Sequence, residues 1–170
     1  MKNAAVKIAL FTLGASVIWI LFEHMMGWNN TNHAIGQYSR TMPMILFWIM
    51  LVVCIWYVRR GHGNSLTFKE GFQSGLIMTL IYCFGFTIVI ILYQQFLNPE
   101  YYQTLKDFTM QQLQSKGASQ SEIDSALKEL EMSQSGTPLS YLLLFVFSTL
   151  WGIGISAIAS AILMKKPKTA

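Results

Sequence analysis

Two adjacent ionisable residues, Glu23 and His24, stand at the end of the first long apolar run of the chain. A carboxylate or an imidazole beside a membrane span can bind a proton or a ligand, so these residues are the first candidates for chemistry. Because they end the run, we expect the Glu23 carboxylate to reach water. His33 follows nine residues after His24, and two histidines at that spacing in a loop do not by themselves predict a metal site.

The other reactive residues do not form a catalytic pattern. Cys54 and Cys83 lie inside apolar runs at different expected depths, which argues against a disulfide and favours packing roles. The sequence contains no Gly-x-Ser-x-Gly elbow, Walker loop, dinucleotide-binding fingerprint or His-Glu-x-x-His motif. We therefore predict no enzymatic activity, no cofactor and no metal.

Small residues recur every four positions in two apolar runs. They are Gly71, Gly75 and Thr79 in the third run and Ser148, Gly152, Ser156 and Ser160 in the fourth. This spacing keeps side chains on one broad helix face, and small side chains allow two backbones to approach closely in lipid. The pattern predicts helix packing through these residues. We expect the residues of the fourth run to pack on the third helix through Gly71, Gly75 and Thr79, and the spacing also fits contact with a second copy in a homo-oligomer.

Four long apolar runs must position all of these residues. The 170-residue chain is 53% hydrophobic and 12% charged, whereas soluble domains average about 25% charged residues. A helix needs roughly 17 to 25 apolar residues to cross a bilayer, and each run approaches or exceeds that length. We predict one all-α membrane domain over residues 1–170, with four transmembrane helices at about 6–26, 42–58, 72–96 and 139–164.

The basic residues predict the orientation of the helices. On one side of the membrane are Lys2, Lys7, Arg59, Arg60, Lys69, Lys165, Lys166 and Lys168, and on the other are Arg40, Lys106, Lys116 and Lys128. Basic residues favour the cytoplasmic side, so this eight-to-four distribution places both termini in the cytoplasm. Residues at helix ends do not form a nucleic-acid-binding face. The first run is longer than the roughly 7 to 15 apolar residues of a signal peptide, which favours a retained helix.

A polar segment, residues 98–137, separates the third and fourth runs and is extracytoplasmic on this topology. Pro99 suits a first helical position, Gly117 is a stop signal, and Ser119 and Glu122 have the spacing of a capping box that begins a second helix. The apolar positions of the two helices are Tyr101, Leu105 and Phe108, then Ile123, Leu127 and Leu130. We predict a helical hairpin, which fits either a packed connector or a docking surface. Its six acidic residues against three lysines disfavour contact with anionic lipid.

Several motifs are typical of a known family. They are Leu66-Thr67-Phe68-Lys69-Glu70-Gly71-Phe72-Gln73-Ser74-Gly75 before the third run, Asn98-Pro99 after it, Gly117-Ala118-Ser119 between the two hairpin helices, and a lysine-rich end. Together they resemble the bacterial membrane family known as domain of unknown function 4199, over nearly the whole chain. The resemblance implies four membrane helices, an extracytoplasmic insertion after the third, and a bacterial inner membrane. It assigns no activity and no catalytic residue.

Two functions from different classes fit this sequence. The leading interpretation is a non-enzymatic accessory or scaffold subunit in the lipid bilayer, whose periplasmic hairpin contacts a membrane or periplasmic protein. The alternative is a small proton-coupled transporter that uses Glu23 or His24.

Overall fold

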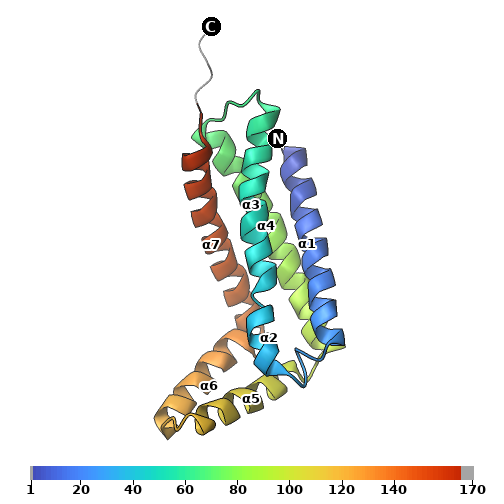
Figure 1. Ribbon diagram of the computed structural model, residues 1–170, viewed down its shortest axis with the longest axis vertical. Helices are drawn as coiled ribbons and strands as arrows, with labels where there is room; N and C mark the ends of the chain where they lie inside the picture. The colour runs from blue at the N-terminus through green and yellow to red at the C-terminus, as the bar shows by residue number, and fades with distance from the viewer. Residues whose placement is uncertain (1, 166–170) are drawn as a thin grey trace.

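The computed structural model describes residues 2–165, and within that range the chain is helical without strands. The four longest helices are α1 (Lys2–Met25), α3 (Met42–Gly61), α4 (Phe68–Leu92) and α7 (Pro138–Leu163) (Figure 1). Each belongs to an apolar segment of 23 to 30 residues that is long enough to cross a membrane. The prediction of four membrane-spanning helices is confirmed at this level of length and composition.

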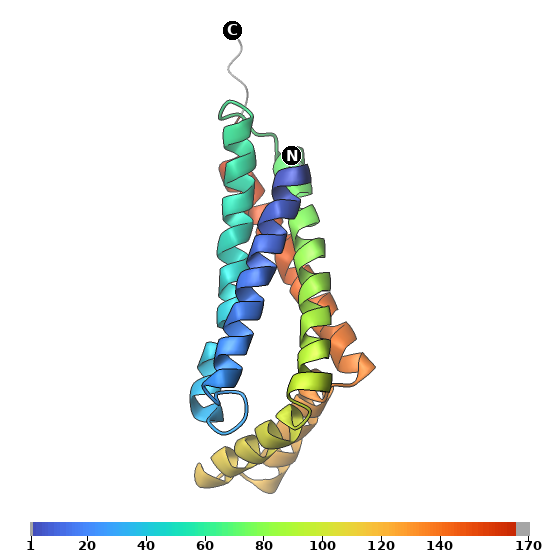
Figure 2. The same cartoon turned by 90° about the vertical axis from the view of Figure 1, so that its right-hand side faces the viewer.

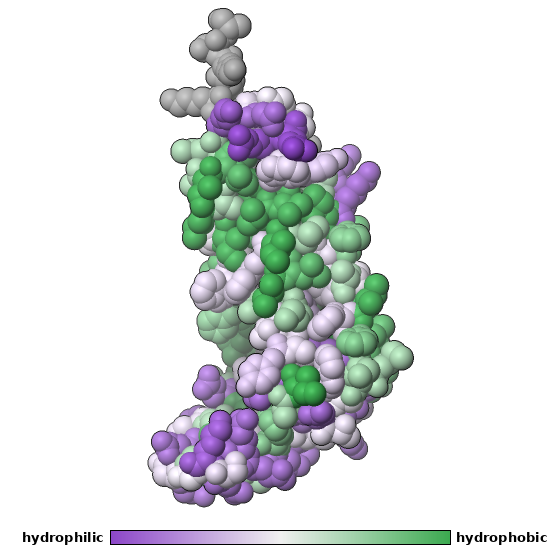
Figure 3. Space-filling model, viewed as in Figure 1, coloured by the Kyte–Doolittle hydropathy of each residue, from purple (hydrophilic) through white to green (hydrophobic). Residues whose placement is uncertain are grey.

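The start of α1, the end of α7 and the connection between α3 and α4 lie at one end of the bundle (Figures 1 and 2). The opposite end carries the shorter helices α5 (Tyr101–Ser115) and α6 (Gln120–Gln134), which lean away from the bundle axis. Between the polar ends, the visible surface of the bundle is largely apolar (Figure 3). Lys166 and Lys168, which contributed to the expected orientation, lie outside the described residues.

Local capping signals start α4 four residues, and α7 one residue, before the expected positions. The Thr67 hydroxyl accepts a hydrogen bond from the backbone N–H of Glu70, and the Glu70 carboxylate accepts one from the backbone N–H of Thr67. This capping box starts α4 at Phe68 rather than at residue 72. Thr137 caps α7 in a similar way, with Pro138 in the first turn.

Two elements were not expected from the sequence. A short helix, α2 (His33–Ser39), precedes α3. Gly27 has a φ of +71°, which lets the chain turn at the end of α1 and fold back toward it. A π-helical turn, η1 (Tyr93–Leu97), ends α4. It closes with a hydrogen bond of 2.8 Å from the backbone N–H of Asn98 to the carbonyl oxygen of Tyr93.

The hairpin contains the two helices expected within residues 98–137. Gly117, with a φ of +73°, lies between them. The first begins at Tyr101 with Glu100 as its N-cap, so the expectation that Pro99 takes the first helical position is wrong. Ser119 and Glu122 form a capping box, and the side-chain and backbone hydrogen bonds from Ser119 lower the pKa of Glu122.

Apolar residues attach the hairpin to the bundle. Tyr101 and Leu105 of α5 are buried in a cluster with Ile20 of α1 and Tyr93 of η1. Ile123 of α6 is also buried, at 5% exposure. Phe108 and Leu130 pack against the cluster from its edge. The hairpin is therefore held by a small apolar core of its own, continuous with the end of the bundle.

Glycine and serine residues allow α4 and α7 to come into close contact within this chain. A Cβ atom added to Gly71 would lie 2.9 Å from the Ser160 Oγ, and one added to Gly75 would lie 2.5 Å from the Ser156 Oγ. A Cβ atom at Gly152 would collide with the Thr79 side chain, whose Oγ1 would be 2.8 Å away. At these positions there is no room for a larger side chain.

The remaining residue of the fourth-run pattern, Ser148, is only partly buried. Its hydroxyl donates to the backbone carbonyl of Leu144, 2.6 Å away, and its side chain lines a cavity near the hairpin. Ser156 and Ser160 are fully buried. The pattern therefore changes character along α7, from tight packing near its end to a cavity wall nearer its start.

Replacing Gly152 with alanine tests this packing. In a helix, Gly→Ala is normally stabilising by roughly 0.5 to 1 kcal/mol, but overpacking a buried site typically costs about 1 to 3 kcal/mol. We expect Gly152→Ala to lower the thermal stability of the protein in detergent. Gly154→Ala is the matched control, because Gly154 is exposed and a Cβ atom there meets nothing within 4 Å. Equal melting temperatures for the two variants would contradict close packing at Gly152.

Candidate functional site

The Glu23 carboxylate is buried, with 2% of the residue exposed. Its Oε1 accepts hydrogen bonds from Trp19 Nε1 at 3.0 Å and from Ser39 Oγ at 2.5 Å. Its Oε2 accepts one from Asn29 Nδ2 at 3.2 Å. The expectation that this carboxylate reaches water is therefore wrong.

The burial of Glu23 follows from the fold of the connection after α1. The backbone N–H of Trp28 donates to the Glu23 carbonyl oxygen at 2.9 Å, which turns the chain back at the helix end. The α2 helix then brings Ser39 over the carboxylate. Burying a carboxylate is costly unless hydrogen bonds replace those lost to water, and the three neutral donors do this here.

The two histidines point to different neighbours. His24 Nδ1 lies 3.2 Å from the Tyr93 hydroxyl, and the two rings meet edge to face. His33 Nε2 lies 2.9 Å from the Thr104 hydroxyl of α5. Among the residues that the structure describes, no three His, Cys, Asp or Glu side chains gather as a metal site would require. Both histidines instead join the end of α1 and the start of α2 to the hairpin side of the molecule.

Asn98 links three segments at the same end. Its Nδ2 donates to the Asn29 carbonyl oxygen at 3.0 Å, to Asn30 Oδ1 at 2.8 Å and to the Tyr93 hydroxyl at 3.1 Å. Asn98 is 5% exposed, so these bonds lie in a largely dry environment. The residue follows the π-helical turn directly, and that turn places its amide against the connection between α1 and α2.

Arg40 is the basic side chain nearest this network. Its Nε donates to the Gly36 carbonyl oxygen at 3.1 Å and its Nη1 to the Tyr101 hydroxyl at 3.0 Å. Burial raises the pKa of Tyr101, while the positive charge of Arg40 opposes that rise. Arg40 Nη2 is buried and has no hydrogen-bond partner among the described residues.

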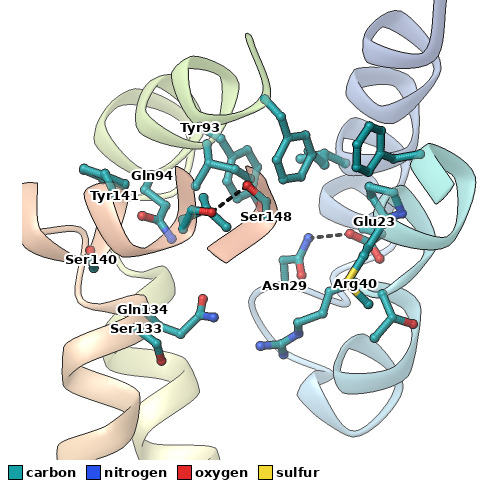
Figure 4. A pocket seen from close by; sticks show the side chains of 18 of the residues that line it. Glu23, Asn29, Arg40, Tyr93, Gln94, Ser133, Gln134, Ser140, Tyr141 and Ser148 are labelled. Carbon is teal, nitrogen blue, oxygen red and sulfur yellow. Dashed lines mark hydrogen bonds between the residues drawn. The ribbon is translucent and has the colours of Figure 1, made fainter. Parts of the chain in front are cut away.

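A cavity of about 320 Å³ lies between these groups. Its walls come from all four long helices, from the start of η1 and from both hairpin helices. Figure 4 shows Glu23, Asn29 and Arg40 on one side and Tyr93, Gln94 and Tyr141 on the other. The cavity lies where the ribbons of α1 and α3 part from those of α4 and α7 toward the hairpin end (Figure 2).

Of the residues singled out from the sequence, Glu23 and Ser148 line this cavity, whereas His24 does not. Cys54 and Cys83 are free and buried in the bundle. Sequence reasoning missed Arg40, Asn98 and Gln94 as site residues. Arg40 contributed only to the charge count, and its position directly before a long apolar run marked it as a basic residue near the membrane without indicating what it contacts.

Comparison with known proteins identifies a family and no individual relative. The family model described as "Protein of unknown function (DUF4199)" matches residues 7–165. Neither the curated proteins nor the solved structures include a match to the chain.

Proposed function

Because the chain belongs to the DUF4199 family of proteins of unknown function, we propose its role from the site and the fold. We propose that it is a non-enzymatic, multi-pass protein of the bacterial inner membrane with both termini in the cytoplasm. In this role it is an accessory or scaffold subunit, and the α5–α6 hairpin contacts a protein partner in the periplasm.

The attachment of the hairpin supports this role. Tyr101 and Leu105 anchor α5 in an apolar cluster, and polar bonds from Arg40 and His33 add two further contacts between bundle and hairpin. A surface held in place before binding loses less conformational entropy when a partner docks. The hairpin therefore has the fixed geometry that a docking element requires.

The exposed surface of α6 is acidic on both sides of its buried stripe, and this acidic surface is the observation on which the proposal rests most directly. Glu122, Asp124, Glu129 and Glu131 are all exposed, and Lys128 is the one basic residue of this helix. A negatively charged face attracts a positively charged one and sets its orientation during association. The partner we propose is accordingly a protein with a basic surface.

Photo-crosslinking from α6 tests the proposal. A photoreactive amino acid at Asp124 in native membranes should give a specific crosslinked product, whereas one at Ile18, which is 70% exposed on a membrane helix, should not give that product. The double variant Glu129→Gln/Glu131→Gln should lose the product because the acidic face is weakened.

A matched control distinguishes the effect of the acidic residues of α6 from the effect of the net charge of the protein. Gln103→Lys/Gln111→Lys changes the charge by the same amount at exposed positions of α5 and should keep the product. Equal yields from the two double variants, or no product from Asp124, would contradict the proposed docking face.

The burial of Glu23 favours a second candidate function, a small proton-coupled transporter. A carboxylate in a cavity between membrane helices can hold a proton and release it when a cation takes its place. Glu23 is the one carboxylate among the described residues that line the cavity. His24 is less suited to this exchange, because it does not line the cavity and its ring bonds the Tyr93 hydroxyl.

Proton exchange can be measured in liposomes that contain the full chain and a trapped pH-sensitive dye. With a pH gradient imposed, this second function predicts that the lipophilic cation ethidium drives proton movement, and that Glu23→Gln abolishes it. Glu100→Gln, at an exposed position in the hairpin, should leave it unchanged. Wild-type rates equal to those of protein-free liposomes, or equal rates in the two variants, would rule the transporter out.

A further inference from the structure

The cavity near the hairpin has two chemically different parts. Deeper in the bundle its wall is apolar and includes Phe47 of α3 and Phe86 of α4, and the rings of Trp48 and Trp151 lie 6.0 Å apart across α3 and α7. Toward the hairpin its wall is polar and includes Arg40. Its volume of about 320 Å³ is near the lower end of the roughly 300 to 1,000 Å³ of small-molecule sites.

The polar part offers hydrogen-bond donors without a partner among residues 2–165, and such donors favour an anionic ligand. Arg40 is fixed through its Nε and Nη1, which leaves the buried Nη2 without a partner in the described part of the protein. The Tyr141 hydroxyl accepts a bond from Gln95 Nε2 at 3.3 Å, so its own proton remains available. The Gln94 side chain also lines the cavity, and its unpaired oxygen, an acceptor, can take a hydrogen bond from a protonated head group or from water.

Glu23 does not cancel this preference for an anion. Both of its oxygens already accept hydrogen bonds, from Trp19, Ser39 and Asn29. Figure 4 shows Asn29 between the Glu23 carboxylate and the opposite wall, with Arg40 beside them. A ligand head group that approaches Arg40 therefore meets donors first, and the carboxylate is screened by an amide that donates to it.

We propose that this cavity binds a single-chain anionic amphiphile. Its carboxylate or phosphate head group pairs with Arg40 at the hairpin end, because guanidinium groups bind both anions with matched geometry. Its hydrocarbon chain lies in the apolar part near Trp48 and Trp151. Such a ligand enters from lipid and fills the space between the two pairs of helices without breaking the bonds of Glu23.

Displacement of a fluorescent fatty acid from the full chain in lipid nanodiscs tests the site. The probe is 11-(dansylamino)undecanoate, and the competitors are dodecanoate, dodecyl phosphate, dodecyltrimethylammonium and inorganic phosphate. We expect saturable binding that the first two compete for and the last two do not. Competition by dodecanoate alone assigns a fatty acid carboxylate, and competition by dodecyl phosphate alone assigns a phosphate head group. Equal competition by dodecyltrimethylammonium, or competition by inorganic phosphate alone, would overturn the proposal.

Variants distinguish binding of the probe in this cavity from its binding to lipid or to other surfaces of the protein. Arg40→Gln should weaken probe binding about tenfold or more, the loss typical of a hydrogen bond to a charged group. Arg60→Gln, with the same charge change at an exposed residue of the opposite end, should not. Since Arg40 also bonds Tyr101, Leu144→Trp provides a second test that fills the apolar part and keeps the arginine. Unchanged binding in both Arg40→Gln and Leu144→Trp would show that the probe binds elsewhere.

Discussion

The fold depends on the close approach of α4 and α7 through side chains too small to hold them apart. In lipid the hydrophobic effect does not drive helices together, so direct packing must do it, and packing is best where backbones meet. Gly71 and Gly75 supply this contact at one end of the bundle against Ser160 and Ser156. Nearer the hairpin, Tyr82 of α4 faces α1 and α3, where its ring stacks on Phe47 and its hydroxyl lies 3.0 Å from the Ser16 hydroxyl. Toward the hairpin α1 and α3 part from α4 and α7, and the cavity lies between the two pairs.

Buried polar groups then determine how the hairpin end is assembled. Once α1 ends beside the cavity, Glu23 must be given donors, and the connection after α1 supplies Asn29 while the end of α2 supplies Ser39. Asn98 joins that same connection to the start of the hairpin. The position of the hairpin is thus coupled to the burial of a carboxylate, which relates the proposed docking surface to the proposed ligand site.

Hydropathy alone was sufficient to predict the four long helices, because a long apolar segment in an apolar medium must pair its backbone groups within its own helix. Short-range signals such as the Ser119 and Glu122 spacing also carry enough information, since a capping box involves only four residues. The spacing of small residues predicted that α7 packs on α4 through Gly71, Gly75 and Thr79, although the same spacing also fitted a second copy, and these residues meet α7 within this chain. The burial of Glu23 and the placement of Arg40 could not be predicted, because both depend on α2, a helix too short to leave a periodic pattern.

The proposed topology places the hairpin on the periplasmic side of the inner membrane and the α3–α4 connection in the cytoplasm, and the docking proposal depends on it. Cysteine accessibility in intact cells measures this directly, in a full chain with Cys54→Ala and Cys83→Ala. One cysteine is introduced as Ser125→Cys, at an exposed position of α6, or as Gly61→Cys, where a new side chain meets nothing within 4 Å. The proposed topology predicts that a membrane-impermeant maleimide labels Ser125→Cys at once and Gly61→Cys only after permeabilisation. Labelling of Gly61→Cys in intact cells with protection of Ser125→Cys would contradict it.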